Sequence, residues 1–582
     1  MAGISSTILA GLGCLVALGL SLQVSKWRRN YRIALSTGFP VFYSPIHISS
    51  VWWMMLYPVL MPILKLLPQS WTSPWLQIAQ VWKIWKLGYE PFQEAGADTF
   101  ILATPSGNML WSSDNAIVRD LFTQHPYVDA PVEFLKFWNV WGPTIASVQG
   151  NEWKAHRRAV TAGFGPAMNR TVWEETQHQT ETLAAHWIEN DNAVIPVIRY
   201  WTSRLALHII CSGFFGLRIE WDNRTAAPLP PGHQIALDAA LPKFIERLSV
   251  FFMVPQGLLG RLPWKKFRDT HLSFTETTKY LEEFRAQVLN NIEAVTAKTN
   301  KTILESIVLS GVTSKDPLPK ESVLGDIFFT LLAGHETTGG TLGFTYLLMA
   351  IYPECQKRMQ AELDDQLGRR PVNQWTLEKD YPVLRQGYVG AIQKEILYVF
   401  NPASFIMRKA LAPVTLVDSH GGSHHIPENT LTLINNAGAA RNPNNWDRPK
   451  VPAERSDTLS DSPALNVNPD RWLEEVDGDD NSSSKNRDLA TWTAFGAGGR
   501  ACPGKEFANI QLTSAMATLF KFYSLELVVE EKTRDECSGD EKLAWEKTRD
   551  KAIKMMYDDM EANITIGVYK DIPIRIVKRT WS

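Results

Sequence analysis

A glycine-rich decapeptide near the C-terminal end of the chain, FGAGGRACPG, contains the residue types with the clearest chemical potential. Its stretch Gly496–Ala501 fits the pattern G-x-G-x-x-G/A, in which a tight turn and a helix N-terminus hold the pyrophosphate of a dinucleotide. The same loop carries Cys502, and a cysteine thiolate is a metal ligand when a helix N-terminus or a nearby cation stabilises it. The loop therefore either cradles a pyrophosphate or presents a thiolate to a metal.

The residues that follow the loop favour the thiolate. A dinucleotide-binding helix that starts at the second glycine would place Pro503 in its first turns, where proline removes a hydrogen bond and clashes with the preceding turn. The candidate ribose-binding acid, Glu526, also lies about thirty residues downstream, whereas the pattern requires about twenty. We expect instead a helix that begins at Pro503, with Cys502 as its N-cap residue and the helix dipole stabilising the thiolate.

The other loop residues then acquire roles of their own. Gly496 and Gly498 permit the unusual dihedral angles of a tight loop around the sulfur atom. Gly504 leaves space for a flat cofactor against the helix, and Arg500 is expected to pair with a carboxylate. The alternative interpretation is a purely structural cysteine in a glycine-rich loop.

This loop resembles the haem-binding signature F-x-x-G-x-R-x-C-x-G of the cytochrome P-450 superfamily, the haem-thiolate monooxygenases. The matching residues are Phe495, Gly498, Arg500, Cys502 and Gly504. A match at five fixed positions is more specific than a glycine triplet. The resemblance implies that these residues bind haem b and that the Cys502 thiolate ligates its iron, which favours cleavage of the O–O bond of dioxygen.

A second segment, LLAGHETTGG (Leu331–Gly340), lies in a long apolar helix pattern. An acid followed by a hydroxyl, Glu336 and Thr337, forms a candidate proton relay there, and the small residues Ala333 and Gly334 let another body approach the backbone. The segment resembles the family's oxygen-activation motif A-G-x-D/E-T-T, which implies that the acid and the hydroxyl are catalytic and that the small pair contacts haem. The alternative is a point rich in glycine and threonine where two helices cross.

The segment EWKAHRR places Trp153, His156 and Arg157 on one helical face. It resembles the W-x-x-x-R segment of the family, which implies that these side chains bind a haem propionate through charge-assisted contacts. Arg408 stands where the family has a further propionate arginine. Further similarities, in NPDRW, RNPNNW and PECQKRMQAELDDQLG, follow the family's order, so that the resemblance covers roughly residues 95 to 580.

One departure concerns the family's E-x-x-R motif. Its glutamate is present as Glu395, but Tyr398 stands three residues later instead of arginine, so the usual buried ion pair cannot form. An uncompensated buried carboxylate costs several kcal/mol. We therefore expect Tyr398 to donate a hydrogen bond to Glu395 or to a partner of Glu395, and a cation from a neighbouring segment, Arg441 or Arg471, to compensate.

The elements that position these residues are mostly helical, because apolar residues recur at spacings of three and four. Helices are expected over Arg157–His178, Thr270–Ala297, Leu324–Tyr352, Glu354–Gly368 and Tyr388–Phe400, and strands over Thr99–Thr104, Thr430–Asn435, Ser524–Val529 and Ile572–Val577. The charge-rich segments Glu454–Ala464 and Glu530–Asp559 are expected to be solvated loops or loose helices. Because the strands are too few for a large sheet, the predicted fold class is mainly α with small peripheral β-sheets. The resemblance implies that this is a cytochrome P-450 fold, and an N-terminal transmembrane helix is expected to precede it.

The N-terminal region is expected to meet a membrane. Ile4–Ser25 carries no charge, and about 22 residues at 1.5 Å each span about 33 Å, enough for a hydrocarbon core of about 30 Å. Positive residues follow this run, which leaves the rest of the chain in the cytosol, whereas the alternative, a cleaved signal peptide, usually begins with them. Val51–Leu64 is shorter, is interrupted by Pro58 and Pro62, and is expected to form an interfacial hydrophobic wedge. The alternatives for this wedge are a buried core helix and a second membrane pass.

Composition excludes other classes of protein. The chain has 582 residues, of which 59 are Lys or Arg and 61 are Asp or Glu, so no excess of positive charge indicates nucleic acid as a partner. Its five cysteines include no C-x-x-C pair, which disfavours a disulfide framework and a zinc site. The predicted organisation is an anchor with its basic flank over residues 1–30, a membrane-proximal linker over 31–90 and a haem-thiolate catalytic domain over 91–582.

The resemblance implies a haem-dependent monooxygenase of the membrane-anchored eukaryotic type, with the style of a fungal enzyme of specialised metabolism. Its single-pass anchor would lie in the endoplasmic reticulum membrane, in contact with lipid, with the catalytic domain facing the cytosol. Electrons would come from a separate NADPH-cytochrome P-450 reductase, with cytochrome b5 as a further candidate, and the substrate would be a lipophilic small molecule. The alternatives are a redox-neutral haem-thiolate isomerase or dehydratase, against which Thr337 argues, and a catalytically silent haem-binding protein marked by Tyr398.

Overall fold

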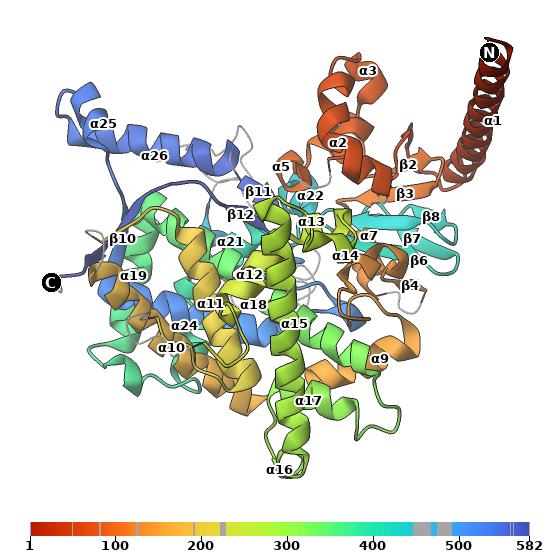
Figure 1. Cartoon of the computed structure of the whole chain (residues 1–582). Coiled ribbons are helices and arrows are strands. Elements are labelled where there is room, and N and C mark those ends of the chain that lie inside the picture. The colour runs from red at the N-terminus through yellow and green to blue at the C-terminus, as the bar shows by residue number, and fades with distance from the viewer. Residues whose placement is uncertain are drawn as a thin grey trace. The chain divides into compact units, whose positions relative to one another are not determined.

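The elements of the computed structural model of the chain are labelled in Figure 1. They form two compact units, each assembled from separate stretches of sequence. The first unit holds residues 1–134, 403–466 and 479–501, and the second holds residues 135–402, 467–478 and 502–582. The structure describes residues 2–48, 50–80, 83–123, 127–189, 193–221, 229–445, 467–473, 492–558, 560–562 and 564–580. For residues 2–16 it describes the backbone alone.

A six-stranded sheet organises the first unit, in the order β1-β2-β3-β9-β6-β4. Its strands are β1 (Val41–Tyr43), β2 (Thr99–Thr104), β3 (Gly107–Ser112), β4 (Val128–Asp129), β6 (Ile406–Ala410) and β9 (Leu431–Ile434). The pairs β1–β2 and β3–β9 are parallel, and the other neighbouring pairs are antiparallel. A hairpin of β7 (Val414–Val417) and β8 (Ser423–Ile426) forms a separate two-stranded sheet. Strands β1 and β4, 3 and 2 residues long, carry too little periodicity to be predicted from the sequence.

Strand β2 is buried along its whole length because the sheet is covered on both faces. Ile101 and Ala103 belong to one hydrophobic cluster, whereas Phe100 and Leu102, which point to the opposite face, belong to another. This double burial explains why the strand reads as a nearly continuous apolar run rather than as an alternating one.

The first unit also contains one long helix, α1, and several shorter ones. They are α1 (Ala2–Leu35), α2 (Val51–Leu64), α3 (Gln69–Thr72), α4 (Trp75–Ile78), α5 (Ile84–Leu87), α6 (Glu90–Ala95), α7 (Asn115–Thr123) and α22 (Asn436–Arg441), with the 3-10 helices η6 (Pro443–Asn445) and η9 (Gly498–Arg500). The last turns of α1 belong to the folded unit, since Trp27 Nε1 donates to the Ala103 carbonyl at 2.7 Å and Asn30 Nδ2 to the Thr104 carbonyl at 2.8 Å. Helix α8 (Val132–Leu135) lies where the chain passes to the second unit.

The expected membrane-spanning anchor over Ile4–Ser25 is not supported by the structure. Helix α1 covers this segment, but within the part of the chain that the structure describes no helix combines the length and the apolar character that a membrane crossing requires. The side chains of residues 4–16, which make up the first half of the expected anchor, lie outside that part.

Helix α2 combines two of the roles considered for its segment. It continues through Pro58 and Pro62, so the expected interruption is wrong. Trp53 is buried in a core cluster, whereas Val59 and Ile63 are 67% and 60% exposed. The helix therefore packs one face against the core and leaves apolar side chains on the other.

The second unit is predominantly helical. Its helices are α9 (Gly150–Thr161), α10 (Pro166–Glu189), α11 (Ile198–Phe215), α12 (Leu237–Glu246), α13 (Leu248–Met253), α14 (Gln256–Leu259), α15 (Lys265–Asn290), α16 (Ile292–Ala297), α17 (Ile303–Ser310), α18 (Lys320–Ile351), α19 (Pro353–Leu367), α20 (Asp380–Gln386), α21 (Tyr388–Val399), α24 (Lys505–Phe522), α25 (Glu531–Glu536) and α26 (Glu541–Asp558), with the 3-10 helices η2 (Lys136–Trp138), η5 (Val372–Gln374) and η8 (Pro469–Trp472). Its strands β5 (Val194–Ile195), β10 (Tyr523–Leu527) and β13 (Ile574–Lys578) form one small sheet, and β11 (Met560–Ala562) and β12 (Ile566–Val568) form another.

Helix α18 is the longest of the second unit, and its sequence explains its position (Figure 1). It is apolar all round and nearly all its residues are buried, as expected of a helix packed on every side. Pro353 ends it, because the residue before a proline disfavours the helical conformation, and the same proline occupies the first position of α19. Helix α11 crosses it closely, since a Cβ on Gly339 would lie only 2.8 Å from Ser203 Cα.

Most of the expected elements are present, with two informative differences. The helix expected over Arg157–His178 is divided into α9 and α10, because Pro166 starts a new helix and Gly163 packs so tightly that its Cβ would lie 2.4 Å from Ile303 Cα. The helix expected over Thr270–Ala297 is likewise divided, into α15 and α16, at Asn291. The charged segment Glu530–Asp559 forms the helices α25 and α26 up to Asp558, which agrees with the helical alternative expected for it (Figure 1). The other charged segment, Glu454–Ala464, lies outside the described residues.

Candidate functional site

The structure divides the residues of the predicted site between the two units. Those of the first unit are Arg408, Phe495, Gly498 and Arg500. Those of the second unit are Trp153, His156, Arg157, Ala333, Gly334, Glu336, Thr337, Cys502 and Gly504.

The glycines of the decapeptide have the backbone geometry that the sequence predicts. Gly496 and Gly498 have φ angles of +62° and +66°, in the left-handed region that favours glycine. Gly498 also permits a close approach of α7, because a Cβ on it would lie 2.2 Å from the Phe122 carbonyl oxygen. The 3-10 turn η9 follows at this point, so no dinucleotide-binding helix starts at the second glycine.

The helix after the decapeptide begins later than the sequence indicates. Helix α24 begins at Lys505 with Gly504 at its N-cap, so the expectation that Pro503 opens the helix and that Cys502 caps it is wrong by two residues. Pro503 and Gly504 form a turn instead. Cys502 therefore precedes the helix N-terminus, and its backbone connection to the helix dipole is less direct than a cap position would give.

Cys502 is the exposed cysteine among the four that the structure describes, whereas Cys211, Cys355 and Cys537 are buried. Desolvation by the surrounding protein raises the pKa of its thiol, while a hydrogen bond from the Gly504 backbone and the charges of Arg157 and Lys505 act in the opposite direction. Three groups thus favour the thiolate, and a further positive charge at the sulfur would add to their effect. A metal cation supplies such a charge, because it deprotonates the thiol that coordinates it.

The space beside this sulfur atom depends on Gly504. A Cβ on Gly504 would lie 4.0 Å from Cys502 Sγ and 3.9 Å from the Phe164 ring. A side chain at this position would therefore contact both the sulfur atom and the Phe164 ring. Together with the cationic surroundings of Cys502, this opening fits a metal-bearing cofactor ligated by the thiolate.

In the first unit, Arg408 and Arg500 gather positive charge around a single carboxylate. Arg500 Nε pairs with Asp129 Oδ1 at 2.7 Å, and this side chain of Asp129 is nearly fully buried. Burial, followed by repulsion from Arg500, lowers the pKa of Arg408 to about 10, against the opposing effect of Asp129. Two guanidinium groups with one carboxylate leave a positive charge in a desolvated place, which fits an anionic group such as a carboxylate of a cofactor.

Helix α9 places Trp153 and His156 in buried positions, as the sequence predicts for one face of the segment. His156 Nδ1 and Asp326 Oδ2 are 2.7 Å apart with both side chains fully buried, and Asp326 Oδ1 accepts from the Ile145 backbone at 2.7 Å. His156 therefore joins α9 to α18 through one ring nitrogen. The other nitrogen, Nε2, is buried without a hydrogen-bond partner in the described chain and remains for a ligand.

Helix α18 presents part of the LLAGHETTGG segment on an accessible side. Ala333 is exposed and Thr337, one turn later, is half-buried on the same face, whereas most of the helix is buried. The Thr337 hydroxyl donates to the Ala333 carbonyl at 2.8 Å, so its lone pairs remain to accept from another group. Gly334 makes room for a side chain of α11, since its Cβ would lie 2.0 Å from Ile210 Cδ1. Its expected contact with haem stays a prediction.

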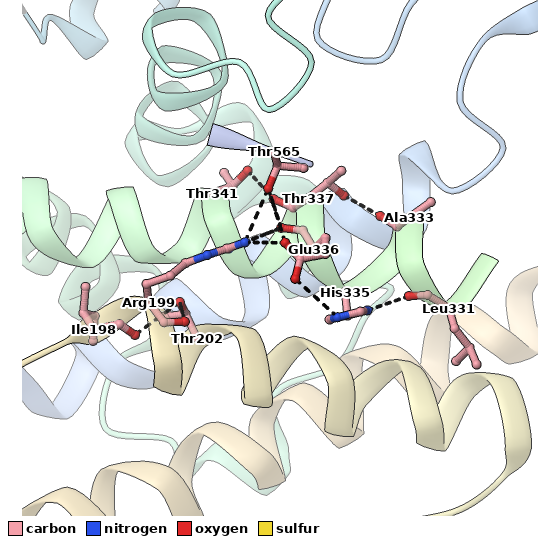
Figure 2. A network of polar contacts seen from close by, with 10 residues as sticks. All are labelled: Ile198, Arg199, Thr202, Leu331, Ala333, His335, Glu336, Thr337, Thr341 and Thr565. Atoms are coloured by element: carbon pink, nitrogen blue, oxygen red, sulfur yellow. Dashed lines mark hydrogen bonds and ion pairs between the residues drawn. The ribbon is translucent and has the colours of Figure 1, made fainter. Parts of the chain in front are cut away.

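Glu336 turns away from Thr337 toward α11, where it meets Arg199 (Figure 2). Arg199 Nη2 lies 2.6 Å from Glu336 Oε2, and the side chains of Arg199 and Glu336 are 4% and 13% exposed. Sequence reasoning missed Arg199. The sequence feature that could have indicated its role is a basic residue in the first turn of an apolar helix, where the helix dipole disfavours a cation.

The departure at Tyr398 is compensated within the second unit. Glu395 is fully buried, and its Oε2 accepts from Arg471 Nε at 2.8 Å and from Trp472 Nε1 at 2.7 Å, while Oε1 accepts from the Asn468 backbone at 2.7 Å. Burial raises the pKa of Glu395, and the Arg471 charge is the largest opposing effect. The predicted compensation by Arg471 is therefore confirmed.

The other expected partners of Glu395 have different roles. Arg441 lies in the first unit and donates to the Trp85 carbonyl at 2.7 Å, so its assignment as a compensating cation is wrong. The hydrogen bond expected from the Tyr398 hydroxyl stays a prediction. The structure shows contacts of its ring, which the Arg471 guanidinium covers at 5.1 Å and which meets the Trp472 ring edge-on at 5.6 Å. The tyrosine thus supports the replacement cation by a cation–π contact.

Comparison with known proteins extends these observations to the whole chain. A family model described as Cytochrome P450 matches residues 74–553. A cytochrome P450 monooxygenase of Arthrobotrys oligospora is 23% identical over 531 residues, covering 86% of this chain and 88% of that protein. A phomenoic acid biosynthesis cluster cytochrome P450 monooxygenase of Leptosphaeria maculans is 22% identical over 534 residues, covering 86% and 89%.

A solved structure shows the same fold. The crystal structure of the cytochrome P450DA heme domain matches with a TM-score of 0.60 and 16% identity, over 84% of this chain and 92% of that one. Since the family model covers most of the sequence and the relatives match over most of their own length, the chain belongs to the cytochrome P450 family and is an enzyme of the monooxygenase class.

Proposed function

We propose that this enzyme inserts one oxygen atom of dioxygen into a lipophilic small molecule, by hydroxylation or epoxidation, with electrons from a separate NADPH-cytochrome P450 reductase. The observation that carries the proposal is the accessible side of α18, where Ala333 and Thr337 lie in a mostly buried helix. A hydroxyl at this place is suited to guiding protons to a bound ligand. The relative from the phomenoic acid cluster supports a role in specialised-metabolite biosynthesis.

Membership of the family implies a haem-thiolate cofactor, which we assign as haem b. Cys502 would hold its iron, and Arg408, Arg500, Arg157, Trp153 and His156 are the candidates for its propionates. When bound, the haem supplies the binding and activation of dioxygen. The exposed Cys502 thiol, its cationic surroundings and the opening at Gly504 support this assignment.

The chain's own residues then divide the proton chemistry between them. The Thr337 hydroxyl donates its hydrogen bond to the Ala333 carbonyl, so its lone pairs can accept a hydrogen bond from an incoming proton donor. Glu336, one residue earlier, is the acid that renews the proton. Its carboxylate is ion-paired with Arg199 in the structure, so it must reorient to reach the accessible side.

Turnover with isotopically labelled dioxygen tests the proposal. The purified full-length protein, combined with a cytochrome P450 reductase and NADPH, is screened against lipophilic compounds that perturb its visible spectrum. The expected result is a product with one labelled oxygen atom, formed only when NADPH is present. Product formed without NADPH would identify a redox-neutral isomerase or dehydratase, and haem binding without any turnover would identify a catalytically silent protein.

We further propose that the enzyme works at the endoplasmic reticulum membrane with its catalytic part in the cytosol, where cytochrome b5 is a second candidate electron donor. The apolar surface of α2, with Val59 and Ile63 largely exposed, supports contact with lipid. A lipophilic substrate would then reach the enzyme from the membrane.

A further inference from the structure

The acid of the proposed proton relay is held by a group that no motif of the sequence contains. Figure 2 shows Glu336 on α18 facing the guanidinium of Arg199, which comes from the first turn of α11. Besides its ion pair with Oε2 at 2.6 Å, this guanidinium approaches the main-chain oxygen of Glu336 through Nη1 and Nη2, each at 3.3 Å. One side chain therefore fixes both the carboxylate and the backbone of the same residue.

The fold provides a slot for this guanidinium. A Cβ on Gly340, one turn after Glu336, would lie 2.9 Å from Arg199 Nη1, and a Cβ on Gly567 would lie 3.2 Å from Arg199 Nε. The hydroxyl of Thr565, in the turn between β11 and β12, lies 3.4 Å from Arg199 Nη2 and 3.5 Å from Glu336 Oε2. The glycine pair at the end of LLAGHETTGG therefore accommodates both the helix crossing and the arginine.

The second oxygen of the carboxylate faces a proton acceptor. His335 Nδ1 donates to the Leu331 carbonyl at 2.7 Å, so Nε2 carries the lone pair of a neutral imidazole. This Nε2 is buried, lacks a hydrogen-bond partner in the described chain, and lies 3.6 Å from Glu336 Oε1. Burial lowers the pKa of His335, which keeps the ring neutral although the Glu336 charge favours its protonation. A proton that arrives between Oε1 and Nε2 therefore finds two acceptors.

We infer that Arg199 is a positioning residue, which holds Glu336 as a retracted carboxylate, that is, a carboxylate turned toward α11 and away from Thr337. His335 Nε2 faces the other oxygen of this carboxylate and can accept a proton there. In this state Glu336 lies on the α11 side of the helix and Thr337 on the accessible side. Proton delivery then requires the carboxylate to exchange Arg199 for a proton, which converts an ion-paired anion into a neutral acid able to turn toward Thr337. The inference rests on the proposed function for its role in catalysis, but the retracted carboxylate itself is a property of the protein alone.

The test compares Arg199→Gln with Arg199→Lys in the full-length protein. Infrared difference spectroscopy at neutral pH detects the carbonyl stretch of a protonated carboxyl group without any turnover. We expect this band in Arg199→Gln and its absence in wild type. The band should also be absent from the Arg199→Gln/Glu336→Gln double variant. In Arg199→Lys, which restores a cation, it should be lost or strongly reduced. The matched control is Arg204→Gln on the same helix, whose partner is Asp238 at 3.3 Å, and which should leave the spectrum of wild type unchanged.

A second variant covers the case in which Arg199→Gln does not fold. Gly340→Ala keeps every charge but places a methyl group against the Arg199 guanidinium, and it should produce the same carboxyl band in weaker form. In turnover with reductase and NADPH, misplacing the acid should lower the product formed per NADPH by about tenfold to a hundredfold and raise the solvent deuterium isotope effect.

The outcomes separate this inference from the proposed function. The inference alone would be overturned by the following result. The wild-type enzyme turns over normally, and the Arg199→Gln or Gly340→Ala protein folds but shows neither the carboxyl band nor a changed isotope effect. If wild type shows no NADPH-dependent turnover, the proposed function fails, and the infrared comparison still decides whether Arg199 holds Glu336 as an anion.

Discussion

The contacts of Glu395 allow losses of unfolding free energy to be predicted, because three hydrogen-bond donors from one short segment surround a single buried carboxylate. The perturbations are Arg471→Met, Trp472→Phe and Tyr398→Phe. The first removes the cation that pairs with Oε2 at 2.8 Å, the second removes the indole donor at 2.7 Å but keeps an aromatic ring, and the third removes only a phenolic oxygen. The three variants therefore separate charge, hydrogen bond and ring contact.

The expected losses of unfolding free energy differ for these variants. Glu395 is fully buried, so removing its only ion-pair partner in the described chain costs about 3–5 kcal/mol, the usual cost of an uncompensated buried charge. Trp472→Phe costs about 1.5–3 kcal/mol, the contribution of a hydrogen bond to a charged group. Tyr398→Phe keeps the ring that lies 5.1 Å from the Arg471 guanidinium, so we expect a loss below about 1 kcal/mol.

The measurement is denaturant unfolding of each full-length variant, followed at several pH values. Burial already raises the pKa of Glu395, and Arg471 opposes this, so its removal raises the pKa further. A carboxyl group that holds its proton more tightly in the folded state destabilises the fold as the pH rises through that pKa, so the Arg471→Met penalty should shrink in acid. Equal penalties for Arg471→Met and Tyr398→Phe, or a penalty for Arg471→Met that grows in acid, would refute the assignment of Arg471 as the compensating cation.

Three further predictions concern the relay, the acid stability and the membrane. Thr337→Ala should keep haem and substrate binding but lower product per NADPH by about tenfold or more, with hydrogen peroxide in its place, and unchanged coupling would refute the relay. A hydrogen bond with His424 lowers the pKa of Asp418 in the folded protein, so the stabilisation that its carboxylate provides is present above the ordinary carboxyl pKa and is lost as the pH falls. Asp418→Asn should therefore reduce the fall of the unfolding free energy toward acid pH, measured by denaturant unfolding. A chain lacking residues 1–24, which keeps Trp27 and Asn30, should still bind lipid vesicles through α2, and complete loss of binding would refute this.

The sequence predicts much of the local structure of the site because glycine and proline act locally. The positive φ angles of Gly496 and Gly498 follow from the need for a tight turn, and both are confirmed. The start of α24 was misplaced, because Pro503 fits either the first turn of a helix or the turn before it. Local preferences thus predict a helix after the loop without specifying its first residue.

The tertiary partners of the site residues could not be predicted in the same way. Arg199 and Glu336 are separated by 137 positions, and His156 and Asp326 by 170, so no periodicity within a helix relates them. The sequence offers two arginines as the cation that compensates the Glu395 charge, because it does not reveal that Arg471 and Trp472 face the same carboxylate. Such contacts arise when whole elements pack together. A sequence pattern indicates which face of one element is buried, but not which element packs against it.

Carbon monoxide binding to the reduced protein tests most directly the claim that Cys502 holds a haem iron. We expect the wild-type protein and the control Cys537→Ala, which alters a buried cysteine, to show the long-wavelength Soret band of thiolate ligation. We expect Cys502→Ala to lose this band while it retains its fold by circular dichroism. Persistence of the long-wavelength band in Cys502→Ala would show that another residue ligates the iron.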